Sequence, residues 1–406
     1  MGEQSSDKKN VLLGVCGSIA AYKAVELARL LVTRGYEVRV VMSPSAQEFV
    51  TPLTFQSVTG QPVTTTYWDG AEAHGIGHIN LADWADVMVI APATADTIAR
   101  LALGSAETPL LGMALATRAP LLVAPAMNVN MFEHPATQEN MLILRKRGVF
   151  FVDPEEGELA CGWNGTGRLA APEQIFHHLR RVVSTQDLKG RRVLITTGPT
   201  REPIDPVRFI TNRSSGKMGI ALAREAFRRG AEVQLVHGPV SVKVPMEVDC
   251  IPVETADEMG QAVVQAIFEA ATPPDIVIMA AAVADFRPVE CASRKMKKAE
   301  RPETIPLAPT TDILLEVGRR RGAVRRPILV GFAVETGEVD DLLAEVRRKL
   351  TAKSADMIVG NLARDAFDAD TNRVWLVDRY GRQDEIATTF KSRVANRILD
   401  AILRLE

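Results

Sequence analysis

Three residues in the first half of the chain have side chains that move protons or hold a carboxylate. His78 lies in GIGHINLADWAD ahead of a helical stretch, Asn128 in PAMNVNM after an apolar run, and Cys161 in the glycine-rich ACGWNGTGRL. Taken singly, they are explained by a helix cap, a turn residue and a loop thiol. Taken together in three loops of one α/β domain, they form an acid–base constellation. We therefore expect a catalytic site in this half.

A phosphate-binding turn is indicated in the second half, where residues 197–219 read TGPTREPIDPVRFITNRSSGKMG. The SSGKMG segment resembles a P-loop, but Thr211 stands where the first glycine belongs and Met218 follows Lys217 in place of Ser or Thr. This spacing argues against a Walker ATPase. A Gly/Ser-rich turn before a helix can still bind phosphate through its N–H groups.

Residues 276–288, IVIMAAAVADFRP, form an apolar run that passes into small residues and then Asp285. Small residues let a base or ribose approach the backbone, and Asp285 can bind a hydroxyl or a Mg²⁺-bound water. The basic run 294–298, RKMKK, is ordinarily a solvent-facing charge run. Near a phosphate turn, it is a candidate clamp for a triphosphate.

Short apolar runs alternate with amphipathic helices in both halves, as with the helical patterns at 19–34 and 219–229. The expected strands are 10–16, 37–42, 87–91 and 121–124, then 192–197, 232–236, 276–280, 328–332, 357–359 and 374–377. This alternation predicts the α/β class, with two domains that each hold a mostly parallel sheet flanked by helices. The polar stretch 184–190 predicts the boundary between domains 1–184 and 190–406.

The bulk properties agree with two domains, since 406 residues exceed one ordinary core. The formal net charge of -2 suggests no nucleic-acid partner. The polar segment 1–10 and the lack of any window of about 20 apolar residues predict a cytoplasmic protein without a membrane span. Four scattered cysteines without a CxxC pair favour neither a disulfide framework nor a zinc site.

The cofactor of the first half is constrained by the motif GVCGSIA, which lacks the second glycine of GxGxxG. The second expected strand ends in Ser43 rather than in an acidic residue that would bind a nicotinamide ribose. These features argue against an NAD-linked oxidoreductase and leave a mononucleotide with a polyol phosphate allowed.

The first ~180 residues resemble the homo-oligomeric flavin-containing cysteine decarboxylases. The stretches that carry this resemblance are GSIAAYK, GHINLADWADVMVIAPATADTIA, PAMN and ACGxxGxGR. The resemblance implies FMN, with His78 beside the flavin, Asn128 holding the substrate carboxylate and Cys161 as the proton donor. The implied FMN contacts are Gly17, Ser18, Ile19, Ser43, Thr94, Ala95, Asp96 and Thr97. Glu107-Thr108 replaces an Asn-Asp pair that many members carry, and Trp163-Asn164 stands where an acidic residue is frequent.

Residues 189–406 resemble the phosphopantothenate–cysteine ligase domain, above all in GPTREPIDPVRFITNRSSGKMG. The resemblance implies CTP and Mg²⁺, with Asn212 at an acyl-cytidylate, Arg208 beside it in the substrate site and Lys295 at the developing oxyanion. The implied nucleotide contacts are Met279, Ala280, Ala281, Asp285, Lys295, Thr311, Asp312, Ile313, Leu314, Phe332, Lys349 and Lys353, with Asp285 also at the metal. Thr310-Thr311 replaces the family's Asn-Pro.

The order of the two halves is that of the bacterial bifunctional phosphopantothenoylcysteine decarboxylase/phosphopantothenate–cysteine ligase family of coenzyme A biosynthesis. The resemblance implies a flavodoxin-like or Rossmann-like flavoprotein domain followed by a Rossmann-like ligase domain. It implies that cysteine is joined to 4'-phosphopantothenate and that the product is decarboxylated to 4'-phosphopantetheine. Decarboxylase trimers and ligase dimers would combine into a dodecamer. The other reading is a non-catalytic flavoprotein that regulates a partner, against which His78, Asn128 and Cys161 together argue.

Overall fold

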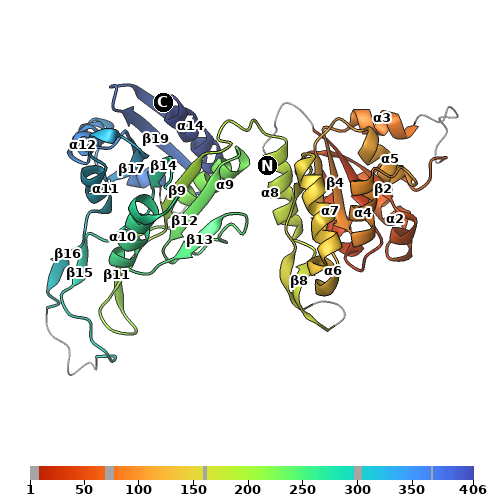
Figure 1. Ribbon diagram of the computed structural model, residues 1–406. Helices are drawn as coiled ribbons and strands as arrows, with labels where there is room; N and C mark the ends of the chain where they lie inside the picture. The colour runs from red at the N-terminus through yellow and green to blue at the C-terminus, as the bar shows by residue number, and fades with distance from the viewer. Residues whose placement is uncertain (1–8, 69–76, 159–161, 297–303, 367–368) are drawn as a thin grey trace. The chain divides into compact units, whose positions relative to one another are not determined.

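The computed structural model describes residues 9–68, 77–158, 162–296, 304–366 and 369–406. The chain divides into two compact units, Met1–Ser184 and Thr185–Glu406, and each is described by itself (Figure 1). Cys161 lies outside the described residues. Within the described part, no helix combines the length and apolar character that a bilayer span needs.

The first unit is built on a six-stranded sheet in the order β3-β2-β1-β4-β5-β6, with every pair parallel. The strands are β1 Asn10–Val15, β2 Glu37–Met42, β3 Val63–Thr64, β4 Val87–Ala93, β5 Leu121–Pro125 and β6 Phe150–Phe151. The helices are α1 Ala21–Thr33, α2 Pro52–Thr59, α3 Gly77–Trp84, α4 Ala95–Leu103, α5 Pro109–Ala116, α6 Val129–Glu133, α7 Pro135–Lys146 and α8 Pro172–Val182. An antiparallel ribbon, β7 Glu155–Glu158 with β8 Asn164–Arg168, lies outside this sheet.

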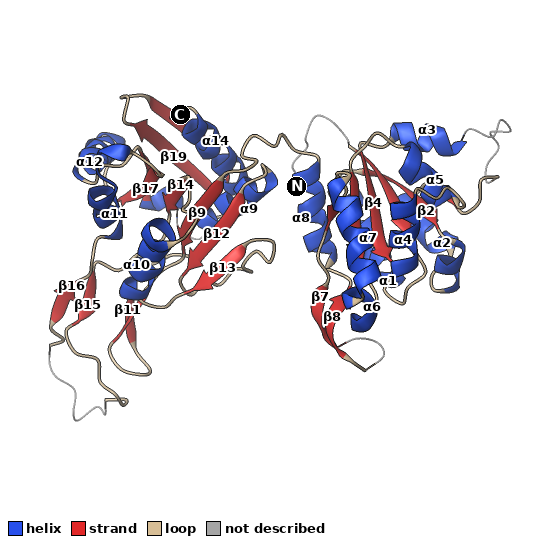
Figure 2. Cartoon of the chain, viewed as in Figure 1, coloured by secondary structure: helices blue, strands red, loops and turns tan. Residues whose placement is uncertain are grey.

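The alternating directions of the side chains along β1 show why helices cover both faces of this sheet. Val11 and Leu13 pack in one core with α1 and α8, whereas Leu12 packs in another with α4, α5 and α7. Successive side chains of a strand point to opposite faces, so a continuous apolar run requires helices on both sides. Figure 2 shows these helices in blue around the red sheet.

The second unit is built on an eight-stranded sheet in the order β13-β12-β9-β14-β17-β18-β19-β20. The strands are β9 Arg192–Thr197, β12 Glu232–His237, β13 Asp249–Pro252, β14 Ile276–Met279, β17 Ile328–Glu335, β18 Met357–Leu362, β19 Thr371–Asp378 and β20 Gln383–Phe390. The helices are α9 Lys217–Arg228, α10 Ala256–Val264, α11 Ile313–Arg321, α12 Val339–Ala352, α13 Ala363–Ala366 and α14 Lys391–Leu403. Pairing is parallel from β13 to β18 and antiparallel through β19 and β20.

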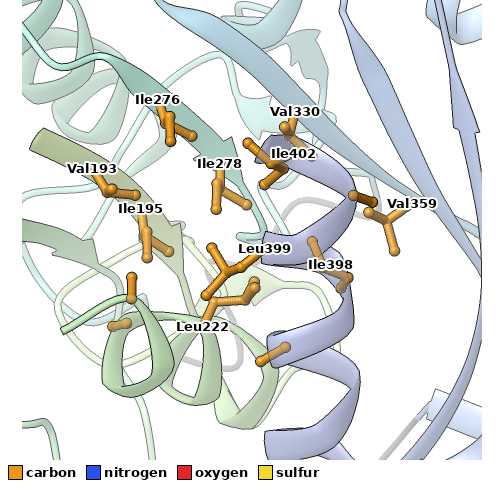
Figure 3. Packing of buried hydrophobic residues seen from close by; sticks show 14 of the residues in the cluster. Val193, Ile195, Leu222, Ile276, Ile278, Val330, Val359, Ile398, Leu399 and Ile402 are labelled. Carbon is orange, nitrogen blue, oxygen red and sulfur yellow. The ribbon is translucent and has the colours of Figure 1, made fainter. Parts of the chain in front are cut away.

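One face of this sheet carries the core drawn in Figure 3, where Ile195 and Ile278 face Leu222 of α9 and Leu399 of α14. The opposite face packs on α10, α11 and α12. Two antiparallel ribbons lie outside the main sheet, β10 Arg201–Pro203 with β11 Phe209–Thr211, and β15 Phe286–Pro288 with β16 Leu307–Pro309. Arg208 lies in the loop between β10 and β11, and Asp285 directly precedes β15.

The predicted α/β class with mostly parallel sheets is confirmed. The strands expected at 37–42 and 192–197 have those bounds, and the helix expected from residue 19 begins at Ala21. The edge strand β20 was not predicted. Its sequence, QDEIATTF, buries only Ile386, so it lacks the apolar alternation that marks a half-buried strand.

Candidate functional site

Most of the predicted flavin contacts follow the carboxyl ends of neighbouring parallel strands. Gly17 to Ile19 follow β1, Ser43 follows β2 and Thr94 follows β4, and these three strands are adjacent in the sheet. The chain continues from β1 to β2 on one side, and β4 lies on the other side of β1. Such a switch point at the carboxyl edge is where open α/β sheets bind ligands.

The turn after β1 is packed tightly enough to require glycine. A Cβ on Gly17 would lie 2.4 Å from the Cβ of Ser45, so any larger residue would push the loops after β1 and β2 apart. The Ser18 hydroxyl accepts a hydrogen bond from the Ala20 N–H at 3.2 Å and shapes the entry to α1. Ile19 stays exposed. The turn therefore offers backbone N–H groups at close approach.

The start of α4 is fixed by hydrogen bonds from two threonines. The Thr94 hydroxyl accepts from the Thr97 N–H at 3.3 Å, and the Thr97 hydroxyl donates to the Cys16 Sγ at 3.2 Å. Burial raises the pKa of the Cys16 thiol to about 11, so this thiol stays protonated. These contacts join the end of β1 to the N-terminus of α4, where Ala95 and Asp96 form the first turn.

His78 lies near the N-terminus of α3, and its ring meets the ring of Tyr67 with 5.0 Å between centroids. Its Nδ1 is buried and has no hydrogen-bond partner among the residues that the structure describes. A buried polar atom of this kind needs a partner, which a bound cofactor or substrate would supply. Asn128 follows β5, and its Oδ1 caps α6 by accepting from the Asn130 N–H at 2.9 Å.

The second unit contains a cavity of about 250 Å³ at the carboxyl ends of β9, β14 and β17. The predicted residues that line it are Met279, Ala281, Asp285, Thr311, Asp312, Ile313, Leu314, Phe332, Lys349 and Lys353. Ala280 does not line it, because alternation along the strand turns its side chain toward the core on the opposite face. Lys295 is exposed and does not line it either.

Sequence reasoning missed the threonines that shape this cavity. Thr196 accepts from the Ala281 N–H at 3.2 Å, and Thr200 accepts from the Ala284 N–H at 3.0 Å. Thr310 donates its hydroxyl proton to the Ala284 carbonyl. A buried threonine at a strand end, such as Thr196, looks like an ordinary sheet residue in a sequence. In the structure these threonines pin the backbone of 281–284, so that Ala282, Val283 and Ala284 also line the cavity.

Two lysines at the cavity wall form ion pairs with carboxylates. Lys353 Nζ lies 3.0 Å from an oxygen of Asp312, and Lys349 Nζ lies 3.3 Å from one of Glu335. Asp312 also caps α11 by accepting from the Leu315 N–H at 3.0 Å. Partly exposed pairs of this kind contribute little stability, so the lysines can exchange their carboxylates for an anionic ligand.

The remaining predicted residues, Asn212 and Arg208, do not line the cavity. Asn212 donates from Nδ2 to the carbonyl of Val283, a cavity residue, at 2.8 Å. Arg208 donates from Nη2 to the Met296 carbonyl at 3.0 Å, which brings it to the segment that carries Lys295. The described residues contain no group of three or more His, Cys, Asp or Glu side chains that could hold a metal ion.

Two protein-family models cover the chain in sequence. The model described as Flavoprotein matches residues 2–184. The model described as DNA/pantothenate metabolism flavoprotein C-terminal domain matches residues 188–405. The first unit is therefore a flavoprotein unit, and the second belongs to the C-terminal class that accompanies it.

Full-length relatives match over nearly the whole chain. The coenzyme A biosynthesis bifunctional protein CoaBC of Vibrio cholerae is 44% identical over 404 residues, covering 98% of this chain and 99% of its own. The Bacillus subtilis protein of that name is 44% identical over 407 residues, covering 98% of each. The Mycobacterium tuberculosis protein is 42% identical over 408 residues, covering 97% of this chain and 96% of its own.

Solved structures match each unit separately. The C-terminal domain of a coenzyme A biosynthesis bifunctional protein CoaBC is 40% identical, with a TM-score of 0.45, covering 55% of this chain and 98% of that chain. A PPC decarboxylase mutant complexed with pantothenoylaminoethenethiol is 35% identical, with a TM-score of 0.39, covering 43% of this chain and 97% of that chain. With two family models in order and relatives of at least 42% identity along their full length, the chain belongs to the family of bifunctional coenzyme A biosynthesis proteins.

Proposed function

We propose that residues 190–406 ligate cysteine to 4'-phosphopantothenate with CTP, and that residues 1–184 decarboxylate the product to 4'-phosphopantetheine with FMN. The observation that carries the ligase proposal is the cavity whose wall combines small residues, two carboxylates and two lysines. A decarboxylase in the same chain would consume what the ligase makes. Fusion of the two would raise the local concentration of the shared intermediate.

The cavity suits a nucleoside triphosphate on three counts. The small residues from Ala281 to Ala284 let a base and ribose approach the backbone. Lys349 and Lys353 would exchange their carboxylate partners for phosphate oxygens. Mg²⁺ is commonly bound by one or two carboxylates together with substrate phosphates, so exposed Asp285 would suffice as the protein's contribution. When bound, the ion would neutralise charge on the phosphates.

Acyl transfer would take place next to this cavity. The 4'-phosphopantothenate carboxylate attacks the α-phosphate of CTP, and pyrophosphate leaves. The amine of cysteine then attacks the acyl carbon of the cytidylate, CMP leaves, and the amine loses its proton. Asn212, which is tied to Val283 of the cavity, would contact the acyl-cytidylate. Lys295 would stabilise the developing oxyanion and Arg208 would bind the substrate.

The first unit suits a flavin mononucleotide. The tight turn at Gly17, with Ser18 and Ile19, would present N–H groups to the phosphate, and Ser43 and the start of α4 would complete the wall. The buried Nδ1 of His78, which has no hydrogen-bond partner in the described part of the chain, would pair with a bound ligand. When bound, FMN would accept a hydride from the substrate and return it, so no net redox change results.

The chain's own residues would handle the carboxylate and the proton. Asn128 would orient the substrate carboxylate, and His78 would hold the reacting end of the substrate. Once the substrate carries a C=S group, loss of CO₂ leaves an enethiolate, because sulfur accepts the electron pair. Cys161, outside the described residues, would protonate that enethiolate.

We also propose a cytoplasmic homo-oligomer without a nucleic-acid or membrane partner. Trimers of the first unit and dimers of the second would together give a dodecamer. Sedimentation of the purified chain measures this directly. A monomeric species that retains both activities would contradict the oligomer proposal.

The nucleotide proposal is tested with Lys353→Met and a matched control, Lys243→Met, an exposed lysine of the same unit that does not line the cavity. Loss of one charged contact to phosphate costs about 1.5–3 kcal/mol, or about 10- to 150-fold in CTP affinity. Titration calorimetry should show this loss for Lys353→Met and unchanged affinity for Lys243→Met. Equal affinities in the two variants would contradict the assignment.

The FMN proposal for the first unit is tested by mass analysis of the cofactor released from the purified chain.

A further inference from the structure

Asp205, in the loop between β10 and β11, is the most completely hydrogen-bonded carboxylate near the proposed acyl-transfer site. Its side chain is fully buried. Oδ1 accepts from the N–H groups of Val207 and Arg208, both at 2.9 Å. Oδ2 accepts from the Nε of Arg208 at 3.0 Å and from its Nη2, and from the Met296 N–H at 3.2 Å.

A buried carboxylate is tolerated in its charged form only where it is paired and hydrogen-bonded. The Arg208 guanidinium, followed by the backbone N–H groups, holds the pKa of Asp205 well below its usual range. Asp205 is therefore ionised at any pH at which the enzyme would be assayed. The pair it forms with Arg208 carries no net charge.

The guanidinium of Arg208 has five N–H groups in a fixed plane. The Nε group and both Nη2 hydrogens are used by Asp205 and by the Met296 carbonyl. No partner of the two Nη1 hydrogens is found among the residues that the structure describes, and the side chain is 30% exposed. Asp205 therefore directs one edge of the guanidinium outward. Arg208 acts as an oriented pair of donors that suits a carboxylate or phosphate oxygen.

The same carboxylate also anchors the segment that carries Lys295. Met296, the next residue, donates its N–H to Asp205 and accepts from Arg208 through its carbonyl. A third link joins the two loops, since the Ala292 N–H donates to the Ile204 carbonyl at 3.0 Å. Residues about ninety positions apart are thus fixed to one buried group.

We infer that Asp205 is a positioning residue of the ligase reaction, which holds Arg208 and the Lys295 segment in one fixed arrangement around the anionic acyl substrate. This inference rests on the proposed function of the second unit. Asp205 does not touch substrate, and it lines no part of the nucleotide cavity. Replacing Asp205 should therefore impair the binding and reaction of the acyl substrate and leave CTP binding intact.

The test uses Asp205→Asn in the full chain, with Asp249→Asn, an exposed acid of the same unit, as the matched control. A misplacement of about 1 Å near the reaction can cost about 100-fold in rate. We expect pyrophosphate formation to fall by about that factor, with a raised KM for 4'-phosphopantothenate and an unchanged Kd for CTP. Decarboxylation of added phosphopantothenoylcysteine should be unchanged in the same sample, because it belongs to the other unit.

A double-mutant cycle with Arg208→Gln separates positioning from simple loss of stability. If Asp205 acts in part through Arg208, the loss in the double variant should be smaller than the sum of the two single losses. Additive losses, or wild-type KM and rate in Asp205→Asn, would overturn the inference. If Asp205→Asn fails to bind CTP, Arg208→Gln, which keeps the three backbone donors to Asp205, must show the selective rise in KM, or the inference fails. If the unmodified chain forms no pyrophosphate with any nucleotide, the proposed function fails instead.

Discussion

The ring of Tyr67 meets the ring of His78 nearly edge to face, with an interplanar angle of 79° and 5.0 Å between centroids. The Tyr67 hydroxyl lies 2.5 Å from the Ala106 carbonyl and 2.8 Å from that of Thr108. A Cβ on Gly112 would lie 2.4 Å from the same hydroxyl oxygen, so α5 leaves no room for a larger residue beside the Tyr67 hydroxyl at this position. The backbone carbonyls of Ala106 and Thr108 thus fix the ring that packs against His78.

Replacing Tyr67 should therefore impair decarboxylation through the orientation of His78. Edge-to-face aromatic pairs contribute about 0.5–1.5 kcal/mol beyond their buried area, which corresponds to about 2- to 10-fold in rate. We expect Tyr67→Leu to lower the rate of CO₂ release by about 10-fold and Tyr67→Phe, which keeps the ring, to lower it less. Pyrophosphate formation by the second unit is the internal control. Wild-type CO₂ release from Tyr67→Leu would show that His78 needs no such support.

Thr310 offers a matched test of the nucleotide cavity. Its hydroxyl donates to the Ala284 carbonyl, and its N–H donates to the Asp285 carbonyl at 2.9 Å. Thr310→Val keeps the shape and removes the hydroxyl, which costs about 1 kcal/mol. We expect about 5-fold weaker CTP binding by calorimetry, with Thr310→Ser close to the unmodified chain. Equal affinity in the valine variant would mean that this hydroxyl does not shape the site.

The sequence predicted the parallel sheets because short β-rich runs such as 37–42 and 192–197 alternate with helical patterns and are followed by turn residues. The family resemblance also implied many residues that the structure places around one cavity, such as Met279 and Phe332. The sequence could not indicate Thr196 or Asp205, because their roles come from hydrogen bonds to residues 85 and 91 positions away. Such pairs exist only once the loops are folded together.

The cysteines should differ sharply in reactivity. Cys16 is buried and its thiol pKa is raised to about 11, whereas Cys291 is exposed. Because the thiolate is the reactive form, iodoacetamide at pH 8 should modify Cys291 and leave Cys16 unmodified. Peptide mass spectrometry after timed quenching measures both sites in one sample. Rapid modification of Cys16 in the folded chain would contradict the packing of β1 against α4.

The stability of the first unit should depend on pH through His178. Burial, followed by nearby Arg181, lowers the pKa of His178 to about 4 from 6.5. Between these values the unfolded chain binds the proton and the folded chain does not, so stability rises with pH and is lost as pH falls below about 6.5. The full effect on the free energy of unfolding is about 3 kcal/mol at most.

His178→Gln should flatten this dependence. Urea midpoints of the first unit, followed by flavin fluorescence at pH 5 and pH 7, measure it, and His134→Gln at an exposed histidine is the matched control. We expect the difference between the two midpoints to shrink in His178→Gln and to persist in His134→Gln. The same difference in both variants would assign the pH dependence to other groups.

The most direct test of the whole account follows both reactions in one purified chain. The chain is given CTP, Mg²⁺, 4'-phosphopantothenate and cysteine labelled at its carboxyl carbon, and pyrophosphate and labelled CO₂ are measured together. We predict one CO₂ for each pyrophosphate in the unmodified chain, and in Cys161→Ser continued pyrophosphate release with strongly reduced CO₂ release. Undiminished CO₂ release from Cys161→Ser, or no pyrophosphate with CTP or any other nucleotide, would contradict the account.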